Sequence, residues 1–413
     1  MNWTRSPNGP ADEEVNPLEP NAQSLSAFQG GILFVGNDAT RTGAPIALLH
    51  FLRWFKTHSN LPFSILLGEG GDLTADFEEL ADTWSTDRSR WCPGGTRVTY
   101  LSRAGFGWWA RRGEIRDVQR FAPSASPALV YVNSIVSART VEMLAPRAPI
   151  LTHVHELDSS FQLVAPPLLS RLIAQTRRFI ACSNAVRENL IRAHGARPEA
   201  VETIYESIPI AQVRPQRTCR EVLRELRIPA DALLVMACGT LNQRKGADLF
   251  LQLAAAVCRQ REEVYFAWIG GGLPAEVAQF ENGIRAAGLA EKVRLTGTVP
   301  HTADYLAAAD VFVLTSREDP YPLVCLEAAS LAKPIVCFAD AGGMPEFVER
   351  DCGFIVPYLD IVAMGDRVVC LLDSPDSRLT MGAAARRKVA QRHDVSATAP
   401  RIMEIIERTI AAG

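Results

Sequence analysis

The chain has 413 residues, 47% of them hydrophobic and 22% charged, which is typical of a globular protein with more than one core. The formal net charge of −3 argues against a nucleic-acid-binding protein, which would be basic. No apolar run approaches the roughly 18 residues of a membrane-spanning helix. The nine cysteines are scattered and include no Cys-x-x-Cys pair, so we expect reduced thiols and a cytoplasmic protein.

Strand and helix signals alternate from residue 31 onward. Short apolar runs typical of buried strands occur in the first half at 31–35, 63–67, 128–132, 150–154, 178–182 and 201–205. Similar runs occur in the second half at 233–238, 264–269, 293–296, 311–315, 335–338 and 354–356. Helical stretches separate them in both halves. Because strands that alternate with helices build parallel sheets covered on both faces, the sequence predicts two α/β domains.

Composition divides the chain into four parts. Residues 1–27 contain Pro, Asn, Glu and Ser without periodicity, which predicts a disordered N-terminal tail. A Pro- and Arg-containing stretch, 209–217, follows the last strand of the first series. We therefore expect an N-terminal domain over residues 28–212 and a C-terminal domain over residues 213–394. Isoleucines at helical spacing predict a final helix within residues 395–413.

The most informative segment joins two predicted strands of the second half. Asp319 lies in a Pro-containing loop, and Glu327 lies on the helix that the loop enters. In a parallel sheet such loops lie at the carboxyl ends of the strands, where ligands bind. Carboxylates accept hydrogen bonds from sugar hydroxyls, and the N–H groups of a helix start attract phosphate. The combination favours a nucleotide sugar as the ligand.

This segment, 316–329, resembles the acid-x7-Glu signature of the family 4 retaining glycosyltransferases. Asp319 and Glu327 occupy the acidic positions, with Glu318 as an alternative first acid one residue out of register. The resemblance implies the GT-B fold, an α/β architecture in which two Rossmann-like domains face each other across a cleft. It also implies a donor-binding C-terminal domain, an acceptor-side N-terminal domain and a last helix, within 395–413, that crosses back to the N-terminal domain.

A second segment of the C-terminal domain, 239–246, follows a predicted strand and opens a helix. It resembles the phosphate-binding loop of the family, and Arg244 and Lys245 are implied to stabilise the departing diphosphate in place of a metal ion. Thr240 stands where the family often has an arginine, for which Arg244 would substitute. A solvated basic turn is the alternative interpretation.

The resemblance also assigns roles on the donor side. Glu327 would accept the ribose hydroxyls, and Asp319 or Glu318 would hold hydroxyls of the sugar. Further donor-binding residues implied are Gly43, Thr240, Leu323, Val324 and Gly343. The usual Phe-Gly of the acidic loop is Tyr321-Pro322 here, and Pro322 has no N–H to offer a ligand.

In the N-terminal domain, His155-Glu156 ends the predicted strand 150–154. It resembles the His-acid dipeptide that the family places near the transferred sugar, which implies that His155 positions substrate and contributes to catalysis. His153 alternates with His155 on the strand, so both point to one face. These two histidines and Glu156 suggest a metal site, but zinc needs three or four ligands and no further ligand is evident. We expect neither a metal nor a cofactor; a purely structural histidine pair is the other interpretation.

The sequence thus predicts a glycosyltransferase that moves a hexose-type sugar from a UDP- or GDP-sugar to an acceptor hydroxyl with retention of configuration. The acceptor would be a glycan, a lipid-linked glycan or a small molecule. A GT-B epimerase or hydrolase of sugar nucleotides and a non-catalytic sugar-nucleotide-binding protein remain alternatives. A dehydrogenase is disfavoured: 270–275 matches a dinucleotide fingerprint, but the next strand ends without the required acid.

Aromatic residues stand beside basic ones between Trp108 and Arg112. Such a patch suggests peripheral contact with the inner face of a membrane. A loop whose tryptophans pack on the domain is the alternative.

Overall fold

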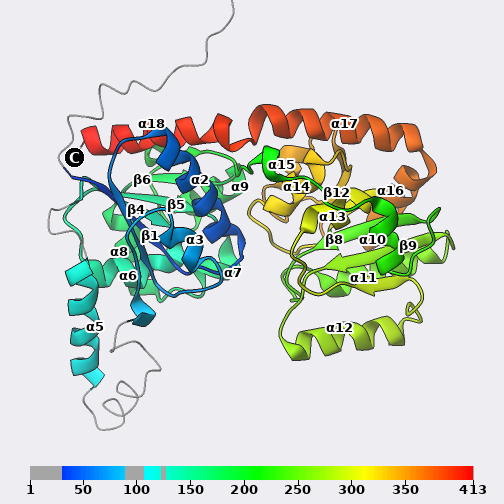
Figure 1. Ribbon diagram of the computed structural model, residues 1–413, viewed down its shortest axis with the longest axis horizontal. Coiled ribbons are helices and arrows are strands. Elements are labelled where there is room, and N and C mark those ends of the chain that lie inside the picture. Colours follow the sequence, from blue (N-terminus) through cyan, green and yellow to red (C-terminus); the bar gives the residue numbers. More distant parts are fainter. Residues whose placement is uncertain (1–29, 89–106, 122–126, 413) are drawn as a thin grey trace, which may run out of the picture.

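The computed structural model describes residues 30–88, 107–121 and 127–412. Two parallel sheets, each covered by helices, form two domains that lie side by side (Figure 1). The predicted fold class is confirmed. The predicted tail, residues 1–27, lies outside the described residues.

The N-terminal sheet has seven parallel strands in the order β3-β2-β1-β4-β5-β6-β7. They are β1 (Ile32–Gly36), β2 (Phe63–Leu67), β3 (Thr83–Ser85), β4 (Leu129–Asn133), β5 (Ile150–Val154), β6 (Thr176–Ala181) and β7 (Val201–Thr203). The helices of this half are α2 (Gly43–His58), α3 (Thr74–Glu78), α5 (Gly107–Phe121), α6 (Ala138–Leu144), α7 (Asp158–Phe161), α8 (Pro166–Gln175) and α9 (Asn184–Arg192). Every residue of β1, β4 and β5 is buried, as expected of strands covered on both faces.

The C-terminal sheet has six parallel strands in the order β10-β9-β8-β11-β12-β13. They are β8 (Leu233–Cys238), β9 (Val264–Ile269), β10 (Val293–Leu295), β11 (Val311–Leu314), β12 (Ile335–Phe338) and β13 (Gly353–Val356). The helices are α10 (Cys219–Glu225), α11 (Ala247–Cys258), α12 (Pro274–Ala286), α13 (Thr302–Ala308), α14 (Leu323–Ser330), α15 (Met344–Val348), α16 (Ile361–Asp373), α17 (Pro375–Arg392) and α18 (Val395–Ala411). The strand order reverses between β8 and β11, and ligands bind at such switch points.

Two consecutive helices span the molecule along one side, α17 over the C-terminal sheet and α18 over the N-terminal sheet (Figure 1). The apolar side chains of Ile402 and Ile406 on α18 belong to the same core as Phe34 and Phe51. The last helix therefore packs as part of the N-terminal domain.

The chain passes between the domains twice, and the two passages are joined by hydrogen bonds. The backbone N–H of Ile208 donates to the carbonyl of His393 at 3.0 Å, and Val395 N–H donates to the carbonyl of Ile208 at 3.2 Å. The N–H of Ile210 donates to the Asp394 carboxylate at 3.2 Å. Each passage therefore fixes the course of the other.

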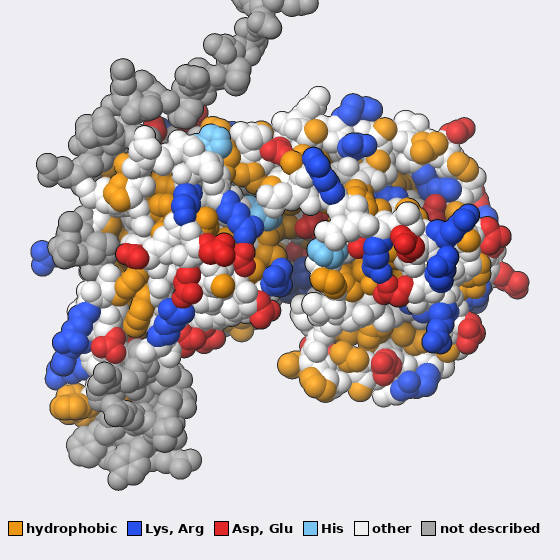
Figure 2. Space-filling view, viewed as in Figure 1, with side chains coloured by type: hydrophobic (Ala, Val, Ile, Leu, Met, Phe, Trp, Pro, Cys, Tyr) orange, Lys and Arg blue, Asp and Glu red, His pale blue; other side chains and the backbone are white. Residues whose placement is uncertain are grey.

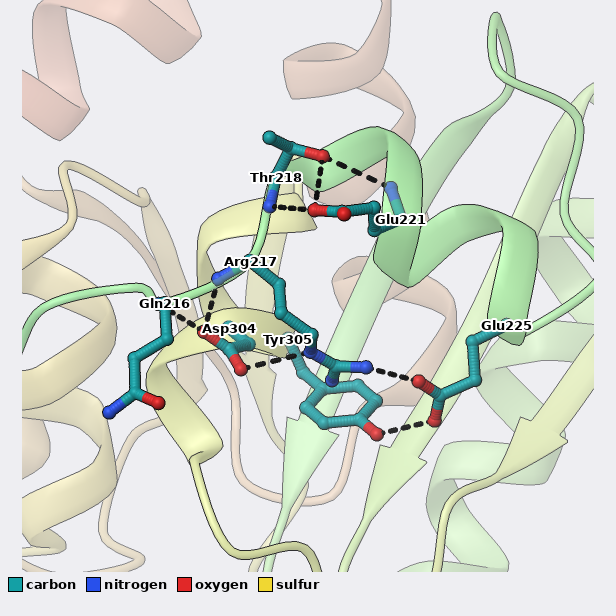
Figure 3. A network of polar contacts seen from close by, with 7 residues as sticks. All are labelled: Gln216, Arg217, Thr218, Glu221, Glu225, Asp304 and Tyr305. Atoms are coloured by element: carbon teal, nitrogen blue, oxygen red, sulfur yellow. Dashed lines mark hydrogen bonds and ion pairs between the residues drawn. The ribbon is translucent and has the colours of Figure 1, made fainter.

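A polar network fastens the first passage to the C-terminal domain (Figure 3). The buried carboxylate of Asp304 accepts hydrogen bonds from the backbone N–H of Gln216 at 2.6 Å and from Arg217 Nε at 3.0 Å. The Arg217 guanidinium also pairs with Glu225, which accepts from the Tyr305 hydroxyl at 2.6 Å. Burial raises the pKa of Asp304, but these donors outweigh it and hold the pKa below its ordinary value.

No helix among the described residues is both long enough and apolar enough to cross a membrane.

Candidate active site

In the C-terminal domain, the basic loop with Arg244 and Lys245 follows β8, and the acidic loop with Glu318 and Asp319 follows β11. Side chains of the first loop contact the second directly. Arg244 donates from Nη1 to the backbone carbonyl of Glu318 at 2.9 Å, and Lys245 Nζ lies 2.6 Å from Asp319 Oδ2. Gly246 has a φ of +71°, and a Cβ there would come within 1.9 Å of the Thr315 carbonyl oxygen. The close contact between the loops therefore requires glycine at this position.

Only one of the two carboxylate oxygens of Asp319 accepts hydrogen bonds from the described residues. Its side chain is almost completely buried, and Oδ2 accepts hydrogen bonds from Lys245 Nζ and from Ser316 Oγ at 3.1 Å. The described residues provide no hydrogen bond to Oδ1. The carboxylate thus orients Lys245 and keeps one oxygen available as an acceptor.

Glu318, the alternative first acid, turns toward the N-terminal domain instead. Its carboxylate accepts from the backbone N–H of Ser159, at 3.1 and 3.2 Å, and from the Ser159 hydroxyl. Ser159 lies in α7, four residues after His155 along the chain. The structure therefore brings Glu318 to the contact between the domains.

Glu327 has the most unusual environment of these acids. Burial raises its pKa to about 7, with no charged group contributing. Within the part of the chain that the structure describes, no hydrogen bond or ion pair reaches its carboxylate. The residue is half-buried, so its carboxylate loses part of its hydration without gaining a partner from the described residues. A ligand that supplies two hydroxyl donors is therefore a favourable occupant.

The N-terminus of α14 offers open backbone donors. The helix begins with Leu323 and Val324, its N-cap is Pro322, and no side chain caps it. The first N–H groups of such a helix carry partial positive charge and suit a phosphate group. Pro322 fits the position because the missing N–H leaves no helical hydrogen bond unmade.

The remaining donor-side residues have ordinary surroundings. Gly43 begins α2, and a Cβ added there would meet no atom within 4 Å, so nothing in the chain itself requires glycine. Thr240 is exposed in the turn after β8. Gly343 packs tightly: a Cβ would lie 2.5 Å from the carbonyl oxygen of Pro320 and 2.5 Å from Ser183 Cβ. The chain's own packing therefore explains Gly343.

In the N-terminal domain the surroundings of His155 favour the protonated form of its ring. Its Nδ1 is paired with Glu206, and its Nε2 lies 2.9 Å from Asn133 Oδ1. The amide nitrogen of Asn133 donates to the Ala44 carbonyl, which fixes its oxygen toward the ring. Burial lowers the pKa of His155, but the charge and hydrogen bond of Glu206 outweigh burial and raise it above the ordinary value. Both ring nitrogens can then donate.

Sequence reasoning missed Glu206 and Asn133. Glu206 lies 51 residues after His155 in the passage between the domains, and Asn133 ends β4. Neither belongs to a recognisable motif. Parallel pairing of β4 with β5, with Asn133 opposite His153, brings Asn133 beside the histidines, and only the pairing could have revealed it.

His153 and Glu156 do not converge with His155 on a possible metal site. Burial lowers the pKa of His153 well below its ordinary value, and its Nδ1 lies 2.7 Å from the Tyr131 hydroxyl. Glu156 turns back to accept from the N–H groups of His155 and Ile135. The candidate ligands that do converge among the described residues are those of His155, Cys182 and Glu206, all buried and within 4.8 Å of one another. The His155–Glu206 ion pair already accounts for two of the three.

The space-filling view shows a hollow between the domains, with acidic and basic side chains inside it (Figure 2). Two family models match the chain: Glycosyltransferase Family 4 over residues 70–212 and Glycosyl transferases group 1 over residues 232–374. Together they cover well over half of the sequence. The chain belongs to glycosyltransferase family 4.

Curated relatives of this family 4 chain include D-inositol 3-phosphate glycosyltransferases. That of Catenulispora acidiphila is 28% identical over 69% of this chain and 73% of its own length. That of Kineococcus radiotolerans is 28% identical over 60% of this chain and 62% of its own length. The family assignment confirms the glycosyltransferase activity predicted from the sequence.

Solved structures place the family 4 chain in the GT-B fold. HepE of Anabaena, described in complex with UDP-glucose, superposes with a TM-score of 0.75 at 20% identity, covering 92% of this chain and 100% of that one. Sucrose-phosphate synthase of Thermosynechococcus elongatus gives a TM-score of 0.74 at 17% identity, with 93% and 100% covered.

Proposed function

We propose that this glycosyltransferase transfers a hexose from a nucleotide diphosphate sugar to an acceptor hydroxyl, with retention of configuration and without a metal ion. The observation that carries the proposal is the half-buried Glu327 carboxylate, whose pKa is raised to about 7 and which the described residues leave without a partner. It lies on α14, whose open N-terminus suits the diphosphate, as Glu327 suits the ribose.

In this proposal each group has one task. Glu327 accepts the two ribose hydroxyls. The amides of Leu323 and Val324 and the cations of Arg244 and Lys245 surround the diphosphate and stabilise the charge that develops as it leaves. Asp319 holds Lys245 with one oxygen and a sugar hydroxyl with the other.

The N-terminal domain supports the other side of the sugar. The His155 imidazolium, fixed by Glu206 and Asn133, is proposed to stabilise the negative charge that develops on the leaving diphosphate oxygen through its positive potential. The anomeric carbon exchanges its bond to the diphosphate oxygen for a bond to the acceptor oxygen on the same face. The acceptor proton passes to the departing diphosphate, so that no protein base is needed.

The similar proteins indicate which donor and which acceptor should be tested first. HepE is described with UDP and with UDP-glucose, which favours a uridine nucleotide sugar as the first donor. The curated relatives favour D-inositol 3-phosphate as the first acceptor.

The test begins with thermal unfolding of the full chain in the presence of UDP, GDP and their glucose and mannose conjugates. A nucleotide that binds the site raises Tm by mass action, and Glu327→Ala removes that increase. The donor so identified is then incubated with acceptors, and the product linkage is read by NMR. Donor hydrolysis or rearrangement without an acceptor would replace the proposal with a hydrolase or epimerase. Binding without turnover on any acceptor would favour a non-catalytic role.

A further inference from the structure

One face of α5 combines exposed aromatic and basic side chains. Trp108 and Trp109 are 52% and 55% exposed, and the Arg112 guanidinium lies 5.1 Å from the ring centre of Trp108. Arg116 and Arg120 are also exposed. At 3.6 residues per turn all five side chains project within roughly one third of the helix circumference. We call these five residues the outer face of α5.

The opposite side of α5 fixes the helix to the domain. Glu114 is buried and accepts hydrogen bonds from Arg139 on α6 at 2.8 and 3.0 Å. Arg111 pairs with Glu142, also on α6, at 2.9 Å. Val118 is completely buried in the core of the domain. The inner side thus accounts for the attachment of the helix to the domain.

The charges on the two sides differ in kind. On the inner side, Arg111 of α5 and Arg139 of α6 are each paired with a carboxylate. In contrast, Arg112, Arg116 and Arg120 form no ion pair within the part of the chain that the structure describes. The outer face carries no acidic residue, although the chain as a whole has a net charge of −3. This face is therefore a local positive surface on an acidic protein.

The location of α5 separates this surface from the catalytic site. Figure 1 shows α5 at the end of the N-terminal domain that is far from the C-terminal domain. Figure 2 shows Lys or Arg side chains along its outer edge and hydrophobic ones at its lower end. A partner bound there leaves the hollow between the domains open.

We propose that the outer face of α5 docks the protein on a membrane surface that contains anionic phospholipids. Tryptophan rings are stable at the level of the lipid headgroups, where the ring is partly dehydrated and its N–H still finds an acceptor. Arginine guanidinium groups reach lipid phosphates, and a basic cluster near an anionic leaflet is attracted electrostatically. The aromatic pair makes a membrane a better fit than a soluble polyanion, which would need the arginines alone.

The experiment is sedimentation of the full chain with vesicles of phosphatidylcholine alone or mixed with phosphatidylglycerol. We expect binding to the mixed vesicles only, weakening as salt is raised. Arg116→Glu combined with Arg120→Glu is expected to lower the partition coefficient at least roughly tenfold. Trp108→Ser combined with Trp109→Ser is expected to lower it as well.

The matched control reverses two exposed arginines elsewhere, Arg386 and Arg387 on α17, with the same change in net charge. The control should bind as the parent does. Equal losses in both double variants, or no binding of the parent to any vesicle, would overturn the proposal. So would full retention of binding in the tryptophan variant, which would indicate a surface for soluble polyanions such as nucleic acid. Circular dichroism and Tm establish that each variant is folded.

Discussion

The ammonium group of Lys245 lies 2.6 Å from the carboxylate of Asp319, and this contact joins the loops that follow the neighbouring strands β8 and β11. Only 17% of the lysine side chain and 5% of the aspartate side chain are exposed. The aspartate therefore fixes the direction of the lysine, so that the charge is in place before the diphosphate arrives.

Lys245→Met is expected to lower kcat about a hundredfold, because the cation stabilises charge that develops on the leaving diphosphate. It also leaves Asp319 buried without its counter-ion, which costs about 3 kcal/mol of folding free energy. The double variant with Asp319→Asn removes that charge, so it should regain stability but not turnover. Urea unfolding and steady-state kinetics separate the two effects. Recovery of turnover together with stability would show that Lys245 serves the fold alone; Arg244→Ala should lower kcat as well.

Donor affinity is expected to depend on pH through Glu327. With a pKa of about 7 in the free protein, the carboxyl group is largely protonated at pH 6 and largely ionised at pH 8. If the ribose hydroxyls donate to the ionised form, affinity for a nucleotide sugar should increase about tenfold over that range, with a proton released on binding. Calorimetry in two buffers of different ionisation enthalpy measures the proton. Glu327→Gln is the control, and an equal pH dependence in that variant would contradict the assignment.

The pair of His155 and Glu206 predicts a pH-dependent stability. The folded-state pKa of His155 is raised, so the pair stabilises the fold below about pH 6.5 and loses that contribution as pH rises through the folded-state pKa. His153, Glu156 and Cys182 also face or adjoin this ring. Glu206→Gln should therefore cost about 3 kcal/mol at pH 6 and clearly less at pH 9. Urea unfolding at the two pH values measures this; an equal penalty at both would mean that His155 is neutral.

Alanine substitutions at two glycines distinguish a glycine that the fold requires from a glycine that contacts the substrate. Gly246→Ala should cost about 2 kcal/mol or more, because φ is positive and the Cβ would strike the Thr315 carbonyl. Gly43→Ala meets open space at the start of a helix, so stability should be unchanged or slightly increased. If the backbone at Gly43 approaches the substrate, kcat/KM nevertheless falls in that variant. An unchanged kcat/KM would remove Gly43 from the site.

Transfer is expected to persist in excess chelator. Arg244, Lys245 and the α14 N-terminus provide the positive charge that a metal ion would otherwise supply. The only converging ligands found in the described residues are those of His155, Cys182 and Glu206. An absolute requirement for manganese or magnesium that is abolished by His155→Ala would contradict this expectation.

The strands of this fold were largely predictable, because each is a short apolar run bounded by polar residues. The predicted ranges 63–67, 150–154, 233–238, 264–269 and 335–338 coincide with β2, β5, β8, β9 and β12. The edge strand β3 was not predicted, since its three residues Thr83–Ser85 are too short for a periodic pattern. Residues 107–121 form a helix that was not predicted, because its exposed face carries the tryptophans that usually mark the buried side.

The site was predictable only where its residues are close in sequence. Asp319 and Glu327 flank the start of α14, and Arg244 and Lys245 both precede the start of α11, so each pair could be recognised locally as a candidate. That Asp319 faces Lys245, and that Glu318 faces Ser159 across 159 residues of sequence, depends on packing between loops and domains. Periodicity carries no information on such contacts.

The hydrogen bonds between the two interdomain passages also determine how the site can open. Because Ile208 is bonded to both His393 and Val395, the passages behave as a single two-stranded hinge rather than two independent tethers. Sliding of one domain along the other would break these bonds, whereas rotation about the pair preserves them. An opening of the site that keeps these bonds would be a rotation about one axis. Such a rotation would separate contacts away from the axis, such as Glu318 with Ser159.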